Sequence, residues 1–269
     1  GNTNLTLTAT AGTLDIAVGN FAAGTGLVTL NTQAAITDTG ALTAASLRLL
    51  GAGTVTLDAA GTDVTNLAMS RTGALTFVDT NSLLVTIVGG TSGITSGGNA
   101  VNLTTTGAAG DLTLNRAVAA GAGTVTLVAG RNLDSTAGGS LNITAAVASL
   151  QAGADGGATG TMGVTGGDSV QTNVSGTLTV NADTVGASAI NVDNGVASAL
   201  TDLLVILADT SAGVSVGANI GGTVTMAAGA SAISGSTGNA TLTLTAAAGP
   251  RDLCGGNLAA GTGVITLDT

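Results

Sequence analysis

The chain has 269 residues, of which 44 are Gly and only one is Pro, and its formal net charge at pH 7 is -10. Hydrophobic residues make up 44% of the chain and charged residues 7%, which is the reverse of a disordered composition. The five cationic residues are scattered, so the clustered positive charge that nucleic acid requires is missing. We therefore expect a folded protein that does not bind nucleic acid.

Short tracts in which two apolar residues flank one polar residue recur along the chain. They are LTL (5–7), VTL (55–57), LTF (75–77), VTI (85–87), VNL (101–103), LTL (112–114), VTL (125–127), LNI (141–143), LTV (178–180), VTM (224–226) and LTL (242–244). Alternation with a period of two places the apolar pair on one face of a strand and the Thr or Asn on the other. Each tract therefore predicts a short β-strand with one buried face.

The spacing of these tracts, about eight to twelve residues, is typical of an all-β sandwich or of a solenoid. Signals for two-residue hairpins are sparse and the apolar residues are almost all aliphatic, which favours a narrow β-solenoid with Gly and Asn at its corners. We expect one continuous solenoid over residues 1–269, with roughly nine to twelve coils that each rise about 4.8 Å. The Gly-rich stretch 152–167 is the candidate for an irregular loop.

The beginning of the chain recurs near its end at a fixed offset of 237 residues. Residues 2–32 align without a gap on residues 239–269, and 19 of the 31 aligned positions are identical. Such a long repeat is typical of elongated proteins in which each unit contacts its neighbours. We therefore expect an internal segment of a longer chain or a stacking subunit, with neighbouring copies of the same repeat as end-to-end partners.

Catalysis has few residues on which to rest. The chain has no His, Lys, Glu or Tyr, so general acid–base chemistry would depend on Asp pairs alone. We therefore predict that it is not an enzyme and that it needs no cofactor. Asn191, Asp193 and Asn194 are candidate Ca²⁺ ligands, because their oxygens lie close together in one loop-like stretch, although the spacing matches no known calcium motif.

Two kinds of surface modification or binding are also compatible with the sequence. Five sequons place candidate glycosylation sites at Asn4, Asn102, Asn142, Asn173 and Asn239. In most of them the middle apolar residue should point inward, which would leave the Asn on the outer face. Thr-x-Thr tracts such as Thr124/Thr126 would offer a face for ice, but the motif is intermittent, and solvent-facing Thr in a strand is the ordinary interpretation.

Residues 36–105, ITDTGALTAASLRLLGAGTVTLDAAGTDVTNLAMSRTGALTFVDTNSLLVTIVGGTSGITSGGNAVNLTT, resemble the repeat region of filamentous-haemagglutinin-like exoproteins. These are very large bacterial surface proteins, many of them exported by two-partner secretion. The resemblance implies a right-handed parallel β-helix that projects from the cell as an adhesin or surface fibre. It implies an extracellular location and a host or neighbouring-cell surface as a partner, and it carries over no catalytic or binding residues.

The favoured hypothesis is a structural β-solenoid segment that gives a secreted bacterial adhesin or fibre its length and rigidity. One alternative is a separate subunit that polymerises end to end into an extracellular filament. Another is a β-helix module that binds sugar, ice or Ca²⁺. No apolar run approaches the length needed to cross a bilayer, so we expect no membrane insertion.

Overall fold

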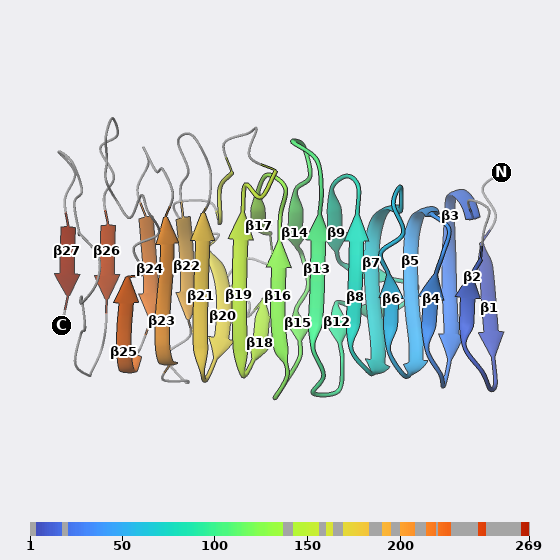
Figure 1. Ribbon diagram of the computed structural model, residues 1–269, viewed down its shortest axis with the longest axis horizontal. Helices are drawn as coiled ribbons and strands as arrows, with labels where there is room; N and C mark the ends of the chain where they lie inside the picture. The colour runs from blue at the N-terminus through green and yellow to red at the C-terminus, as the bar shows by residue number, and fades with distance from the viewer. Residues whose placement is uncertain are drawn as a thin grey trace.

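The computed structural model describes residues 4–17, 21–136, 142–155, 160–163, 169–182 and 190–194, and the backbone of the strands within 200–207, 214–218, 220–226, 242–245 and 265–268. Every regular element in these residues is a β-strand. The strands lie side by side along one axis, with the first strand at one end and the last at the other (Figure 1). The chain is therefore an elongated stack of strands.

Two parallel sheets run along this axis. Sheet A has 15 strands. Its main path is β1 (Leu5–Ala9), β3 (Phe21–Thr32), β5 (Leu42–Ala52), β7 (Asp63–Thr72), β12 (Ile94–Thr95), β15 (Val118–Ala119), β18 (Ile143–Ala145), β20 (Val170–Val174), β22 (Ile190–Asn194), β24 (Val214–Ala218), β26 (Leu242–Thr245) and β27 (Ile265–Asp268). Its branch is β9 (Leu83–Val85), β14 (Leu112–Leu114) and β17 (Leu133–Ser135), and it starts beside β7.

Sheet B has 10 strands. In order along the axis they are β2 (Leu14–Ile16), β4 (Ile36–Asp38), β6 (Val55–Leu57), β8 (Leu75–Asp79), β13 (Val101–Thr105), β16 (Thr124–Val128), β19 (Val147–Ala152), β21 (Thr177–Ala182), β23 (Leu200–Leu207) and β25 (Ile220–Met226). The chain alternates between sheet A and sheet B, and each strand pairs in parallel with the equivalent strand of the next coil. This topology is a parallel β-solenoid, as the tract pattern predicts.

The coils differ in length. Along sheet B the step from one coil to the next ranges from 19 residues (Ile36 to Val55) to 30 residues (Ala148 to Leu178). Between residues 4 and 182 the chain makes about seven turns. This is slightly fewer than the nine to twelve coils expected for the whole chain, and strands after residue 190 extend both sheets further.

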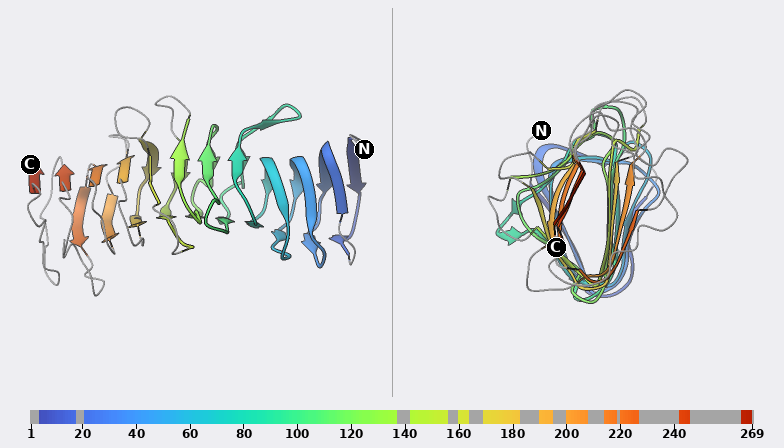
Figure 2. Two further views of the ribbon diagram at one scale, coloured as in Figure 1. Left: turned by 90° about the horizontal axis from the view of Figure 1, so that it is seen from above. Right: turned by 90° about the vertical axis from the view of Figure 1, so that its left-hand side faces the viewer.

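The core is a set of aliphatic columns between the two sheets, which face each other across a narrow interior in the end-on view (Figure 2). In one column Val28, Leu47, Leu67 and Val85 stack at equivalent register positions on successive coils, and all four are fully buried. Phe77 is the largest fully buried side chain among the described residues. Because each apolar residue covers the one below it, the hydrophobic core is continuous along the axis.

The cross-section changes along the solenoid. In the first coils sheet A contributes one long strand per coil, with 12 residues in β3, 11 in β5 and 10 in β7. In the next three coils sheet A has two short strands instead, β9 with β12, β14 with β15 and β17 with β18, and β9 and β12 pair with different parts of β7. Among the described strands, three strands per coil therefore occur only in the coils that contain β9, β14 and β17.

A small antiparallel hairpin interrupts the solenoid where this change occurs. It consists of β10 (Ile87–Val88) and β11 (Thr91–Ser92) and leaves the main stack in Figure 2. The VTI tract (85–87) predicts one strand with both apolar residues inward, and this is wrong at Ile87. The chain turns outward after Val85, so Ile87 belongs to the hairpin and is 49% exposed.

The stretch 152–167 is described only in part. Gly160–Gly163 contains Met162, which is fully buried and bridges Leu133 on one coil and Ile190 on the next. Residues 156–159 and 164–167 lie outside the described residues. This Gly-rich stretch thus contributes at least one residue to the core.

Candidate functional site

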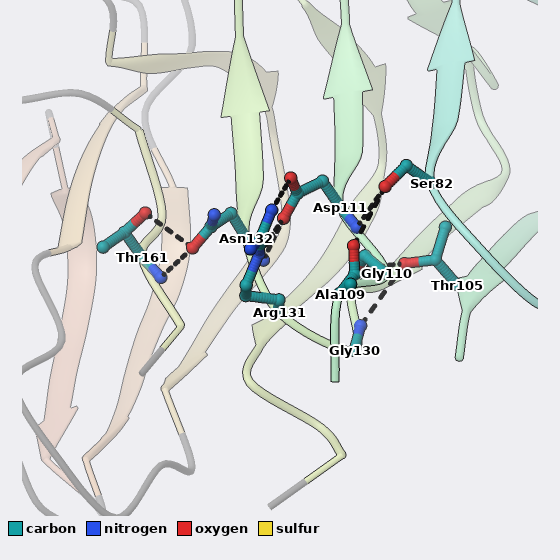
Figure 3. A network of polar contacts seen from close by, with 9 residues as sticks. All are labelled: Ser82, Thr105, Ala109, Gly110, Asp111, Gly130, Arg131, Asn132 and Thr161. Carbon is teal, nitrogen blue, oxygen red and sulfur yellow. Dashed lines mark hydrogen bonds and ion pairs between the residues drawn. The ribbon is translucent and has the colours of Figure 1, made fainter. Parts of the chain in front are cut away.

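A ladder of polar side chains joins successive coils at the corner that precedes β9, β14 and β17 (Figure 3). The backbone N–H of Asp111 donates to Ser82 Oγ at 3.1 Å, that of Asn132 to Asp111 Oδ1 at 3.2 Å, and that of Thr161 to Asn132 Oδ1 at 3.0 Å. Each side-chain oxygen accepts the amide N–H of the equivalent residue one coil further on. The ladder therefore satisfies corner amides that no strand pairs.

An ion pair reinforces the centre of this ladder. Arg131 Nε donates to Asp111 Oδ1 at 2.7 Å, and Arg131 Nη2 contacts Asp111 Oδ2 (Figure 3). Burial alone would raise the pKa of Asp111, but the hydrogen bonds and charge of Arg131 and the Asn132 amide together lower it. The Arg131 side chain is 39% exposed, so the pair adds only about 0–1 kcal/mol to stability. Its main effect is to fix the position of Asp111.

A buried hydroxyl lies beside this corner. Thr105 Oγ1 donates to the carbonyl of Gly110 at 2.7 Å and accepts from the N–H of Gly130 at 3.3 Å. Thr105 is 1% exposed, so its hydroxyl replaces the water that these backbone groups would otherwise bind. Figure 3 shows Thr105 on the side of Asp111 away from Arg131.

Arg71 is a buried cation that donates to backbone carbonyls. It is the last residue but one of β7 and is 3% exposed. The guanidinium donates to the carbonyls of Thr32 at 3.2 Å and Ala34 at 2.8 Å on one coil, and to those of Leu50 and Ala52 on the next. Burial lowers the pKa of Arg71. The side chain thus ties the corners of three coils together.

The metal candidates do not share one face of β22. Asn194 is 2% exposed and points inward; its Oδ1 accepts from Thr172 Oγ1 at 2.7 Å and from the Val174 N–H at 2.9 Å. Asn191 and Asp193 are less buried and alternate with the buried Val192 and Asn194 along the strand. Within the described residues, no group of three or more His, Cys, Asp or Glu is placed to hold a metal ion.

The sequons differ in accessibility. Asn4 is exposed, and Asn102 and Asn173 are half-buried on outer faces. Asn142 is fully buried, and its Oδ1 accepts the N–H of Gln171 at 2.8 Å, so the expected outward position of this Asn is wrong. The corner before β18 turns both Asn142 and Ile143 inward. Asn239 lies outside the described residues.

The Thr residues of the strand tracts form an ordered column on the outer face of sheet B. Residues Thr37, Thr56, Thr76, Asn102, Thr126, Ser149 and Thr179 occupy equivalent register positions on seven successive strands. The column is continuous in polar, uncharged side chains, but a second Thr two residues earlier occurs on only some strands. This outcome agrees with an intermittent Thr-x-Thr motif.

No protein-family model, no curated protein and no solved structure matches the chain. Among the described residues there is no helix with the length and apolarity to cross a bilayer. The polar groups described above mainly hold neighbouring coils together, because they bind the backbone groups of those coils.

Sequence reasoning missed the corner ladder, Arg71 and Thr105. A signal for the ladder was present, because Ser82, Asp111, Asn132 and Thr161 each directly precede an inward Leu or Met. The signal for Arg71 was absent, because a surface Arg and a carbonyl-binding Arg look alike in sequence.

Proposed function

We propose that the chain is a structural β-solenoid segment of a large secreted bacterial surface protein, where it serves as a rigid stalk or fibre of an adhesin. The continuous aliphatic core and the parallel pairing of every coil with the next support a mechanical role. The resemblance of residues 36–105 to filamentous-haemagglutinin-like exoproteins supports the surface location.

The observation that carries this proposal is a pairing register that recurs with the sequence repeat. Leu5 pairs with Val28 in sheet A, and Leu242, 237 residues later, pairs with Ile265, the counterpart of Val28. The following three residue pairs repeat at the same offset. The long sequence repeat is therefore also a repeat of backbone pairing within one sheet.

This register gives the repeat an axial length. Ten strand-to-strand steps along the main path of sheet A separate β1 from β26, and at about 4.8 Å each they span roughly 50 Å. Neighbouring copies of the repeat, joined end to end, would continue both sheets without a change of register. Such continuation also covers the open strand edges that an isolated solenoid exposes.

Two forms of this fibre are distinguishable by mass. A covalent stalk places many repeats in one very long polypeptide, whereas a polymerising subunit gives a denatured band close to the 25.0 kDa of this chain. A denaturing gel and an intact mass of the native material separate them. A band at the subunit mass would overturn the covalent stalk.

The rod shape and the cell-surface location are tested by separate experiments. Small-angle scattering of the isolated chain should give the profile of a rod, and a compact particle would overturn the mechanical role. An antibody raised against the chain should label intact cells that produce the protein. Labelling only after the cells are made permeable would overturn the surface assignment while leaving the rod untouched.

A further inference from the structure

The outer face of sheet B carries a flat array of uncharged side chains, which we call the uncharged face. It covers β8, β13, β16, β19 and β21, with three outward positions per coil, and two of these positions, Ala74 and Ala100, directly precede β8 and β13. Its residues are Ala74, Thr76, Val78, Ala100, Asn102, Thr104, Thr124, Thr126, Val128, Val147, Ser149, Gln151, Thr177, Thr179 and Asn181. None is charged, and eleven of the fifteen side chains are Ala, Val or Thr and so carry a methyl group.

The face is regular because the five strands pair without a shift of register. Thr76, Asn102, Thr126, Ser149 and Thr179 form its central column, and they are all half-buried. Val78 and Val128 lie in the next column, and Val147, which is 37% exposed, lies on the other side. The face therefore offers mainly methyl groups and short hydroxyls, and Gln151 is its longest side chain.

The face carries no charge, although the chain as a whole is acidic. The net charge is -10, so two copies repel each other where acidic residues meet. Asp58 follows β6 at one end of the face. Asp79 belongs to β8 but points inward and is fully buried. Across β8, β13, β16, β19 and β21, two copies can therefore approach without bringing like charges into contact.

We propose that the uncharged face binds the same face of a second copy, so that solenoids associate side by side. The two sheets would then pack face to face, as in a β-sandwich, with methyl groups of Val78, Val128 and Val147 leaving water. Uncharged hydroxyls and amides lose less on desolvation than the Asp residues at the corners would. A two-fold axis through the face would make the contact self-complementary.

The area of the face predicts the strength of the contact. Five strands about 4.8 Å apart and three positions about 7 Å apart give roughly 500 Å² per copy. The total of about 1,000 Å² is at the low end of specific interfaces, so one chain should associate weakly. In a fibre of many repeats the area grows with length, and the association becomes stronger.

The association between two copies should depend on ionic strength in a characteristic direction. Raising the salt concentration from about 0.01 M to about 0.15 M shortens the Debye length from about 30 Å to about 8 Å, which screens the repulsion between the acidic chains. The contact itself contains no ion pair that salt would weaken. Association should therefore strengthen with salt.

Sedimentation equilibrium of the 269-residue chain at the two salt concentrations tests the proposal. The apparent mass should rise toward that of a dimer with protein concentration, and more so at high salt. Thr126→Asp places a like charge at the centre of each face and should leave a monomer. Thr126→Asn, which introduces the residue already present at Asn102, should retain the dimer.

The matched control is Thr144→Asp, because Thr144 is a half-buried outward residue of sheet A with the uncharged register partners Ala119 and Asn173. It should associate like the unmodified chain.

Three outcomes would overturn the proposal: a monomer at every condition, a dimer that Thr126→Asp leaves intact, or an equal loss of dimer in Thr126→Asp and Thr144→Asp. Open-ended filaments that persist in Thr126→Asp would instead indicate end-to-end contact and would also overturn it. Circular dichroism spectra confirm that each variant is folded, and a rod-shaped monomer would leave the proposed function intact.

Discussion

Asp79 accepts a hydrogen bond from the backbone N–H of Val64, with 2.7 Å between its Oδ2 and the amide nitrogen, inside a fully buried corner. Its other oxygen accepts the N–H of Asn81 at 2.8 Å. Burial is the main cause that raises the pKa of Asp79 to about 6, and the charge of Asp63 adds to it, while the two amides oppose the shift. The carboxyl is thus a hydrogen-bond acceptor held in an environment that disfavours its charge.

The stability of the solenoid should therefore fall as the pH rises through the pKa of Asp79. The folded state holds this proton more tightly than the unfolded chain, in which the pKa is near 3.8. The contribution is complete below about pH 4 and is lost by about pH 6–7, and its size is on the order of 3 kcal/mol. Guanidinium unfolding at about pH 4 and about pH 7 measures this difference.

The variant Asp79→Asn isolates the effect from other titrating groups. Asn presents one oxygen and one NH₂ to the two amide donors, so the variant is less stable than the parent at low pH. It cannot ionise, and its free energy of unfolding should lack the part of the decrease that comes from Asp79. Parallel pH profiles for the parent and the variant would show that Asp79 does not cause the decrease.

The strand tracts predicted the fold because their apolar pairs obey a strictly local rule. Val55 and Leu57, for example, are buried around the outward Thr56, as the alternation requires. The rule fails where a corner intervenes. Asn142 points inward beside Ile143, and Ile87 leaves the sheet after Val85, because the backbone turns between neighbouring residues. Local alternation contains no information on where such turns occur.

The polar interior could not be predicted in the same way. Asp79 follows Leu75 and Phe77 in perfect alternation, so its inward direction is readable, but a polar residue at a strand end is equally typical of a loop. Its partner Val64 belongs to the preceding coil, 15 residues away. The contacts of Arg71 lie up to 39 residues away. Pairing between coils of variable length decides these contacts, and no short motif encodes it.

Replacing Arg71 by Met should destabilise the chain strongly. The substitution keeps a long side chain but removes every donor from a corner where the carbonyls of Thr32, Ala34, Leu50 and Ala52 converge. Unsatisfied buried acceptors cost about 1–3 kcal/mol each. Partial relaxation should reduce the total to roughly 2–4 kcal/mol, measured by chemical unfolding.

Arg116→Met is the matched control for this change. Arg116 is half-buried, and its guanidinium donates to the carbonyl and the side-chain oxygen of its neighbour Asn115. Its loss should change stability by no more than about 0.5 kcal/mol. The loss of stability in Arg71→Lys should lie between the losses in Arg71→Met and Arg116→Met, because one ammonium cannot reach carbonyls on two coils. Equal losses in the two Met variants would contradict a special role for Arg71.

Replacing Asp111 by Ala should cost more than replacing its ion-pair partner. Arg131→Gln removes an exposed charge and should cost about 0–1 kcal/mol, and less at high salt. Asp111→Ala also removes the acceptor of the Asn132 N–H and breaks the corner ladder, which should add about 1–2 kcal/mol. Thermal unfolding of both variants at two salt concentrations compares them. A similar, fully salt-dependent loss in both would show that only the ion pair matters.

A close backbone approach between coils predicts a strict requirement for Gly73. A Cβ atom at this position would lie 2.0 Å from the carbonyl oxygen of Gly53 on the preceding coil. The obstacle is backbone and cannot rotate away, so Gly73→Ala should push two coils apart and destabilise the chain by about 2 kcal/mol or more.

Gly90→Ala is the control, because Gly90 has a φ of +87° but no atom within 4 Å of its Cβ position. It should cost only the backbone strain of about 1–2 kcal/mol. Hydrogen exchange should show faster opening of the amides around β6 and β8 in Gly73→Ala alone, and equal protection in both variants would contradict the close approach.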